Sequence, residues 1–292
     1  MENAGQISVE SNNHSFKMTF HNMFSQYTAG QIDLLKERKE RIEEWPRIEG
    51  RPVAANLIEK GEGSFSGCLG NLKMLHGELA DYSWFALHDL TAFKYHSFIT
   101  AKLMYIRAKH LDEEGVMSES ECYYALMSDS ELAFNWIKHQ LPHSDLFRGR
   151  MINAARDEYR HYQLNLALNA NWSDLAERSK FFLNSPPAKM KKYVPDMKFY
   201  LALAEGDCTG MTSALTELCS PAFAKIRNDV FELFVPGNFV SPFACIYAKI
   251  ASRHGHSLQI DSTLIPAEWI PILPLENYTS PYGFMSDWDM TN

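Results

Sequence analysis

The tripeptide Leu166-Ala167-Leu168 recurs 35 residues later as Leu201-Ala202-Leu203, and this repeat indicates the fold of the chain. Each copy lies in an apolar pattern of helical spacing and is followed by a short polar turn. The offset is close to the roughly 34-residue period of tetratricopeptide-type hairpins, in which each helix pair buries its apolar face by stacking on the next. The sequence therefore predicts an all-α array of antiparallel, tetratricopeptide-like helical hairpins.

The turns around this repeat set the expected boundaries of the hairpins. Asn169-Ala170-Asn171 and Glu205-Gly206-Asp207 are polar turns, and Asp207 is placed to cap the helix that follows it. Gly255 is placed to end the last helix. A strand pattern appears only at Leu258-Gln259-Ile260. We expect helices over residues 150–168 and 173–183, 196–204 and 208–219, and 222–234 and 239–253.

The region before the array begins with a polar tail over residues 1–28. A short, highly charged helix is expected over residues 31–45, where Pro46 ends it. Residues 61–70 are rich in glycine and serine but lack the Gly-Lys-Ser/Thr ending of a phosphate-binding loop, so we expect a linker there.

Residues 71–111 are dense in apolar and aromatic side chains, which predicts helices at the centre of a domain. Ser118-x-x-Glu121 and Ser128-x-x-Glu131 both match a capping box, in which side chains satisfy the first free backbone N–H groups of a helix. The expected organisation is a tail over residues 1–28, one helical domain over residues 29–265 and an ordered, proline-rich segment over residues 266–292 that packs on the helical body.

Composition narrows the possible functions. The net charge of −8, from 36 acidic and 28 basic residues, disfavours direct nucleic-acid binding and favours a basic partner. No secretory signal and no apolar run of membrane-spanning length is present, so a cytoplasmic protein with no membrane association is expected. Five scattered cysteines without a C-x-x-C pair predict buried free thiols: Cys68, Cys122, Cys208, Cys219 and Cys245.

Two patterns suggest metal chemistry. Glu158 and His161 stand one helical turn apart, as in di-iron bundles, although a helix face salt-bridged through neighbouring arginines explains the same spacing. His88-Asp89 resembles a metal-binding dipeptide, and His96 lies two turns further on, yet histidines bonded within an aromatic core give the same pattern. Because no second ligand pair and no Gly-x-Ser-x-Gly motif accompany them, no catalytic residue, metal or cofactor is expected.

The last fifteen residues combine aromatic side chains with carboxylates. Aromatic residues are frequent at interface hot spots, and carboxylates can meet Lys or Arg of a basic partner. The alternative is a packed terminal segment whose aromatic rings fill grooves on the array. The candidate binding residues are Tyr278, Tyr282, Asp287, Trp288 and Asp289.

These patterns resemble the immunity protein 49 family. The resemblance covers residues 70–271 and rests on residues 84–111, on the helical hairpins, and on Ala248-Lys-Ile-Ala-Ser-Arg-His-Gly255 followed by Ile260-Asp261-Ser262 and Ile265-Pro266. A second helical immunity group, paired with polymorphic nuclease toxins, looks nearly as similar. The resemblance implies an all-α bacterial protein that binds and blocks a secreted toxin encoded beside it.

We therefore predict an immunity protein that neutralises a cognate secreted antibacterial toxin, expected to be a basic nuclease, by stoichiometric occlusion. The acidic balance agrees with such a partner. One alternative is a tetratricopeptide-like adaptor that binds a peptide or protein partner. A second is a helical metalloenzyme that uses His88, Asp89, His96, Glu158 and His161.

Overall fold

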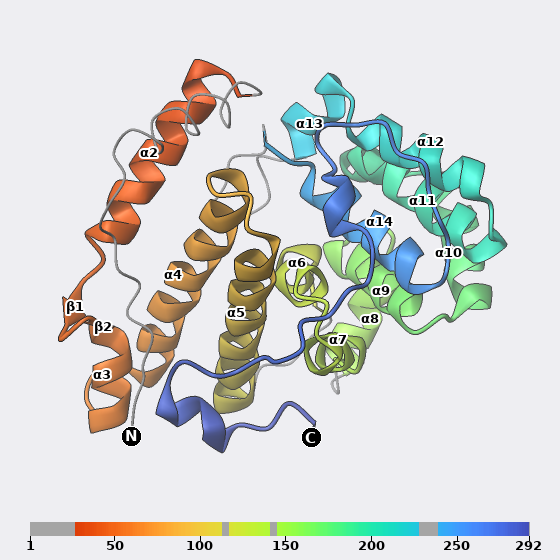
Figure 1. Ribbon diagram of the computed structural model, residues 1–292. Coiled ribbons are helices and arrows are strands. Elements are labelled where there is room, and N and C mark those ends of the chain that lie inside the picture. The colour runs from red at the N-terminus through yellow and green to blue at the C-terminus, as the bar shows by residue number, and fades with distance from the viewer. Residues whose placement is uncertain (1–26, 113–116, 141–144, 228–238, 292) are drawn as a thin grey trace.

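The computed structural model describes residues 27–112, 117–140, 145–227 and 239–291, and it is an all-α array, as predicted (Figure 1). The residues of the predicted polar tail before Tyr27 lie outside this range. The helices are α2 (Ala29–Glu43), α3 (Val53–Lys60), α4 (Phe65–Phe85), α5 (Leu90–Leu111), α6 (Glu119–Met127), α7 (Glu131–Lys138), α8 (Asp145–Met151), α9 (Asp157–Leu168), α10 (Trp172–Asn184), α11 (Val194–Glu205), α12 (Cys208–Leu218), α13 (Pro221–Arg227) and α14 (Pro242–Arg253), with 3-10 helices η1 (Ala188–Tyr193), η3 (Ala267–Trp269) and η4 (Gly283–Asp287).

A long antiparallel pair, α4 and α5, separates the N-terminal elements from the array (Figure 1). Helix α2 packs on the outer side of α4, and a short ribbon of β1 (Arg47–Ile48) and β2 (Arg51–Pro52) leads into α3. The expected linker over residues 61–70 was wrong in its second half. Ser64 caps α4 by accepting from the Gly67 N–H at 3.2 Å, and Gly67 and Gly70 lie within the helix, where α4 packs along α5.

One of the two predicted capping boxes is confirmed and the other is wrong. Ser118 caps α6 through a complete box with Glu121. Helix α7 is capped instead by Ser130, whose hydroxyl accepts from the Ala133 N–H at 3.4 Å, while Ser128 ends α6. Between the two serines Asp129 is buried with a positive φ of 60°, because its carboxylate is bound by two lysines from other helices.

The hairpins around the repeated tripeptide are confirmed. Helices α9 and α10 meet at residues 169–171, and α11 and α12 meet at Gly206, which takes the left-handed conformation at a φ of 71°. Asp207 caps α12 by accepting from the Gly210 N–H at 3.0 Å. A Cβ on Gly210 would lie 2.5 Å from Asp207 Oδ2 and 2.9 Å from Ala202 Cβ, so a glycine allows the two helices to approach this closely.

The helix expected over residues 150–168 is interrupted. Helix α8 ends at Met151, and α9 begins only at Asp157. The Arg178 side chain of α10 explains how the break is stabilised, because its Nη2 donates to the Met151 carbonyl at 2.6 Å and its guanidinium lies over the Tyr159 ring at 4.1 Å.

The last predicted pair is described only at its ends, because residues 228–238 fall outside the described range. Arg227 of α13 forms a buried ion pair with Asp196 of α11, with Nη2 to Oδ1 at 2.8 Å, which fixes α13 to the array. Gly255 follows α14 with a φ of 83°, as predicted. Residues 258–260 form no strand, and β1 and β2 are the paired strands in the described parts of the chain.

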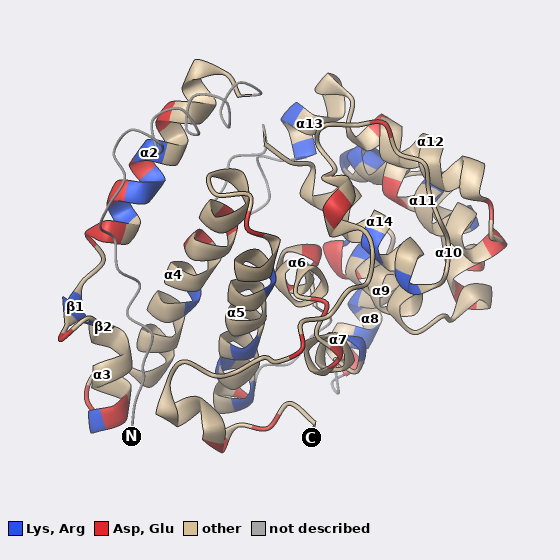
Figure 2. Cartoon of the chain, viewed as in Figure 1, with Lys and Arg blue, Asp and Glu red and all other residues tan. Residues whose placement is uncertain are grey.

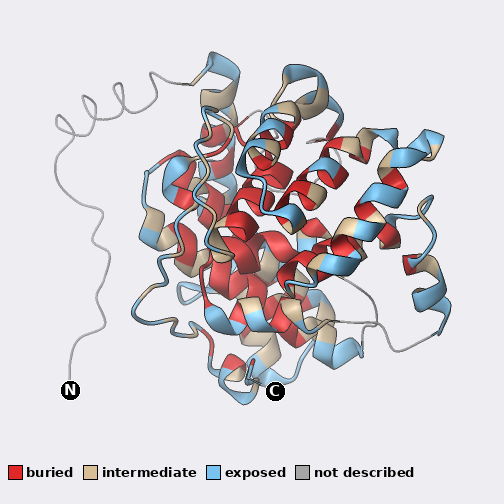
Figure 3. Cartoon of the chain, turned by 90° about the vertical axis from the view of Figure 1, so that its right-hand side faces the viewer, coloured by how far each residue is buried: buried red, intermediate tan, exposed pale blue. Residues whose placement is uncertain are grey.

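Helix α14 lies at the centre of the array, and every residue from Pro242 to Ala251 is buried. Figure 3 shows the buried positions concentrated along the inner faces of the helices, with exposed positions on the outside. Lys249 is among the fully buried residues of α14, at 0% exposure, and therefore needs compensating partners.

Candidate partner-binding surface

The chain beyond α14 forms an irregular segment, residues 254–291, that crosses the helical body (Figure 1, blue). We call these residues the C-terminal segment. Its anchor is Trp269, which is 1% exposed and stacks on Phe93 of α5 with ring centroids 4.3 Å apart. Its end reaches α4, where the Trp288 ring stacks on Phe65 at 6.4 Å.

A buried charge cluster holds the middle of the C-terminal segment. Lys94 of α5 and Lys249 of α14 contact opposite oxygens of Asp129, at 2.8 Å and 2.5 Å. Both ammonium groups also donate to carbonyls of the segment, Lys94 to Leu273 at 2.7 Å and Lys249 to Trp269 at 2.5 Å. Burial lowers the pKa of Lys249 to about 8, with Asp129 opposing that shift. One carboxylate and several backbone dipoles thus compensate two buried cations.

The predicted binding residues Tyr278 and Tyr282 are committed to internal contacts. The Tyr278 hydroxyl donates to the Ser128 carbonyl at 2.6 Å. Tyr282 is 6% exposed, and its hydroxyl lies 2.9 Å from Nε2 of His76. His76 Nδ1 lies 3.0 Å from His96 Nδ1, so one ring must donate and the other accept. Burial lowers the pKa of His96 to about 4 and that of His76 well below its ordinary value.

The other three predicted residues reach the surface. Asp287 and Asp289 are exposed, and Trp288 between them is partly exposed. Hydrogen bonds from Thr291 lower the pKa of Asp289, and the Asp289 carbonyl accepts from the Tyr105 hydroxyl at 2.5 Å. The structure thus brings a partly exposed tryptophan and two exposed carboxylates together at the end of a fixed backbone.

The acidic surface extends further than the predicted residues. From His254 onward the chain contains five carboxylates and no Lys or Arg, and Figure 2 shows no basic residue on the C-terminal segment. All five side chains are exposed, and none forms an ion pair within the described residues. Sequence reasoning missed the first three, although the absence of basic residues after Arg253 signals them. The five are Asp261, Glu268, Glu276, Asp287 and Asp289.

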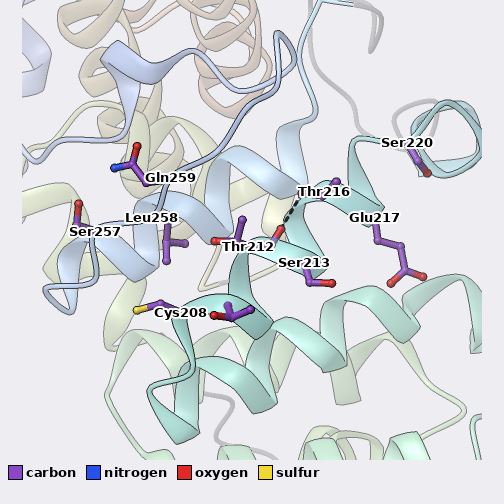
Figure 4. Close-up of a pocket in the computed structure, with 10 residues that line it drawn as sticks. Cys208, Thr212, Ser213, Thr216, Glu217, Ser220, Ser257, Leu258 and Gln259 are labelled. Carbon is purple, nitrogen blue, oxygen red and sulfur yellow. Dashed lines mark hydrogen bonds between the residues drawn. The ribbon is translucent and has the colours of Figure 1, made fainter.

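A groove of about 750 Å³ runs between α12 and residues 257–259 (Figure 4). Short hydroxyl side chains such as Thr212 and Ser213 line its α12 wall. Its carboxylate, Glu217, pairs with Lys198 at 2.8 Å. The groove therefore offers hydrogen-bonding groups, whereas the uncompensated charge lies along the rest of the C-terminal segment.

The cysteines are all free among the described residues. Cys68, Cys122 and Cys245 are buried as predicted, and burial raises the pKa of Cys122 and Cys245 well above the ordinary value. The prediction was wrong for Cys208, which is exposed, with its Sγ 3.8 Å from His256 Nδ1. Cys219 is only partly buried.

The candidate metal ligands are dispersed. His88 and Asp89 are exposed in the turn before α5, where Asp89 caps the helix, whereas His96 contacts His76. Glu158 pairs with Arg150 at 3.3 Å. The described residues contain no group of three or more His, Cys, Asp or Glu side chains arranged to hold a metal ion.

His161 is held by an arginine rather than by the glutamate one turn before it. Nη2 of Arg160 donates to its Nε2 at 2.9 Å. Arg160 itself pairs with Glu119 of α6, so the helix face that the sequence suggested is salt-bridged to other helices and not within α9.

Comparison with known protein families gives a match to part of the chain. A family model described as immunity protein 49 matches residues 145–269. The resemblance found in the sequence is thereby confirmed, over the helices from α8 to η3. This part of the chain is thus similar to immunity proteins.

The remaining comparisons add no relative. Neither the curated proteins nor the solved structures include a significant match to the chain. Among the described helices, none has the length and apolar character required to span a membrane.

Proposed function

We propose that this immunity protein binds a cognate secreted toxin, a basic nuclease, and neutralises it by stoichiometric occlusion in the cytoplasm. It acts by binding and not by catalysis. The observation that carries the proposal is the match to immunity protein 49 together with a fixed surface segment whose five exposed carboxylates form no ion pair with any described residue. A nuclease presents Lys and Arg to phosphate, so such a segment complements it in charge.

The predicted binding residues take different parts in this proposal. Asp287, Asp289 and the partly exposed Trp288 contact the toxin, since these residues reach the surface. Tyr278 and Tyr282 hold the backbone that presents them, because their hydroxyls are bonded to Ser128 and His76. A rigid presenting segment lowers the entropy lost on binding.

The first experiment is co-expression with the protein encoded beside this chain. The proposal expects the neighbour to be lethal alone and harmless with this chain, and the two to co-purify one to one. Purified toxin should degrade DNA, and the complex should not. A toxin with another activity would overturn the nuclease assignment, and rescue without a complex would overturn occlusion.

The second experiment tests the surface with matched charge. Glu268→Gln/Glu276→Gln/Asp287→Asn removes three carboxylates from the C-terminal segment. The control Glu37→Gln/Glu40→Gln/Glu44→Gln removes the same charge from exposed positions at α2 and its C-terminal end. Exposed charges at an interface act mainly on the association rate. At low salt we therefore expect the association rate constant with the toxin to fall by about tenfold or more for the C-terminal variant, and to stay unchanged for the α2 control.

The indole is tested separately from the charges. Trp288→Ala removes an aromatic ring at the proposed contact and should speed dissociation, because truncating an anchor at an interface acts mainly on the off-rate. The toxin would be shown to bind elsewhere if wild type, Trp288→Ala and the C-terminal charge variant bound it with equal affinity. That result would not contradict the proposed immunity function.

A further inference from the structure

An unpaired stretch of backbone follows α14. Residues 257–261, which we call the edge, include no proline, so each offers a backbone N–H and a carbonyl. Within the described residues none of these groups takes part in a hydrogen bond. The nearest backbone hydrogen bonds are made by His256, which donates to Ala251 at 3.0 Å, and by Ser262, which accepts from Ile265 at 3.2 Å. A run of unpaired groups is a template on which another extended chain can pair.

The side chains of the edge alternate as they do in a β-strand. Leu258 and Ile260 are partly buried and pack against the core, whereas Ser257, Gln259 and Asp261 are exposed. Figure 4 shows Leu258 pointing toward α12 and Gln259 pointing away from it. The strand pattern predicted here from the sequence is thus present without a partner strand in the described parts of the chain.

The groove between α12 and the edge has room for another chain. Its volume of about 750 Å³ lies within the usual range for ligand sites. Thr209 and Thr216 are exposed along its α12 wall, and Cys208 lies at the end beside His256. Threonine methyl groups and Leu258 give the groove apolar surface, whereas the backbone of the edge supplies hydrogen-bonding groups.

A matching strand pattern occurs in the N-terminal tail, outside the described range. Phe16, Met18 and Phe20 alternate with polar residues, so an extended chain presents the three apolar side chains on one face. Lys17 is the only charged residue from position 11 to position 32, so this stretch is positively charged. Such a strand complements a groove in a C-terminal segment whose charged residues are all acidic.

The tail joins the described structure near the C-terminal end of the edge. Tyr27, the first described residue, packs on Phe239 with ring centroids 5.3 Å apart. Two residues after Phe239, the Ser241 N–H donates to the Leu264 carbonyl at 2.8 Å. An extended chain spans about 3.3–3.6 Å per residue, so residues 16–20 reach about 25 to 40 Å from Tyr27. That length is enough to follow the edge back to its N-terminal end, and the two chains then run parallel.

We propose that residues 16–20 pair with the edge of the same chain as an added, parallel β-strand, with Phe16, Met18 and Phe20 facing the groove. The strand satisfies backbone groups that the described residues leave unpaired. It also buries apolar side chains that are otherwise exposed in a tail. The proposal is independent of toxin binding, because it concerns contacts within this chain.

Amide hydrogen exchange of the full chain tests the pairing. A paired strand should slow exchange at the edge by about tenfold or more relative to an unstructured chain. Met18→Ser/Phe20→Ser removes two apolar contacts and should raise exchange at the edge by about tenfold or more, without changing exchange in α12. Met23→Ser/Phe24→Ser removes the same two residue types outside the alternating stretch. This matched control should exchange as the wild type does.

A disulfide to the native Cys208 tests the position of the strand. In a parallel strand His14 continues the alternation of Phe16 and lies toward the Cys208 end of the groove, so His14→Cys places a thiol there without removing an apolar side chain. Mild oxidation with diamide should form an intrachain disulfide between the two thiols, which mass spectrometry detects after digestion. Adding Met18→Ser/Phe20→Ser keeps the same chain length and should slow formation of that disulfide by about tenfold or more.

Three outcomes would overturn the proposal. One is exchange at the wild-type edge as fast as in an unstructured chain, including the case in which the edge becomes protected only when the toxin is added. Another is an equal effect of Met18→Ser/Phe20→Ser and Met23→Ser/Phe24→Ser on that exchange. The third is a His14→Cys chain that forms no disulfide with Cys208, or one whose disulfide links two chains and so assigns the groove to the tail of a second copy. Unchanged exchange in α12 shows that each variant is folded.

Discussion

Replacing Asp129 tests how the C-terminal segment is held. Asp129→Asn removes the one carboxylate that Lys94 and Lys249 share, and asparagine tolerates the left-handed backbone found there. The two ammonium groups bind opposite oxygens of that carboxylate. Without it they would repel, and two like charges about 5 Å apart repel by about 3 kcal/mol at an effective dielectric constant of about 20. Breaking a buried pair costs about 3–5 kcal/mol in comparable cases.

The assay is urea unfolding with a thermal melt. We expect a loss of about 3–5 kcal/mol in the free energy of unfolding, or about 6–20 °C in Tm. Asp112→Asn is the matched control, because Asp112 also has a positive φ, of 49°, but is exposed at the end of α5. It should change stability by less than about 0.5 kcal/mol.

A double-mutant cycle separates charge from packing. Lys249→Met removes one of the two cations, so Asp129→Asn/Lys249→Met should lose about 1–3 kcal/mol less than the sum of the single variants. Strict additivity, or an Asp129→Asn variant as stable as Asp112→Asn, would refute the view that this carboxylate compensates both lysines.

Three further predictions concern pH and packing. The pKa of Lys249 is about 8 in the folded chain against an ordinary 10.5, so the unfolded chain binds more protons between these pH values. The free energy of unfolding should therefore rise from pH 8 to about 10. In Lys249→Met, denaturant unfolding should show a smaller rise over the same pH range. The pKa of His96 is about 4 in the folded chain against an ordinary 6.5, so the stability present above pH 6.5 should fall as the pH approaches 4. A His96→Gln variant whose denaturation midpoint falls as steeply with pH as that of the wild type would contradict this. Gly210→Ala should lower the free energy of unfolding by about 1–3 kcal/mol through overpacking. Gly70→Ala, where an added Cβ meets open space, should be neutral or stabilising by up to about 1 kcal/mol. Equal urea midpoints for the two variants would argue against a close α11–α12 contact.

The match to immunity protein 49 ends where the most acidic part of the surface begins. Residues 145–269 include Asp261 and Glu268, whereas Glu276, Asp287 and Asp289 follow the matched range.

The amino-acid sequence by itself determined the elements whose signals are local. Ser118, Gly206 and Asp207 act on backbone groups within a few residues, and each was placed correctly from sequence. The hairpin turns and the all-α class follow from the same short-range patterns. The acidic composition of the last 39 residues is likewise plain in the sequence.

Tertiary structure decided the rest, because the deciding partners are far apart in the chain. Ser130 caps α7 in place of Ser128 since Asp129 is drawn between Lys94 and Lys249. Tyr282 is bonded to His76, which is 206 residues away, and so it is buried while Trp288 is only partly buried. Pairings of this kind depend on which helices pack together, so only the fold could separate the side chains that hold the C-terminal segment from those that it presents to solvent.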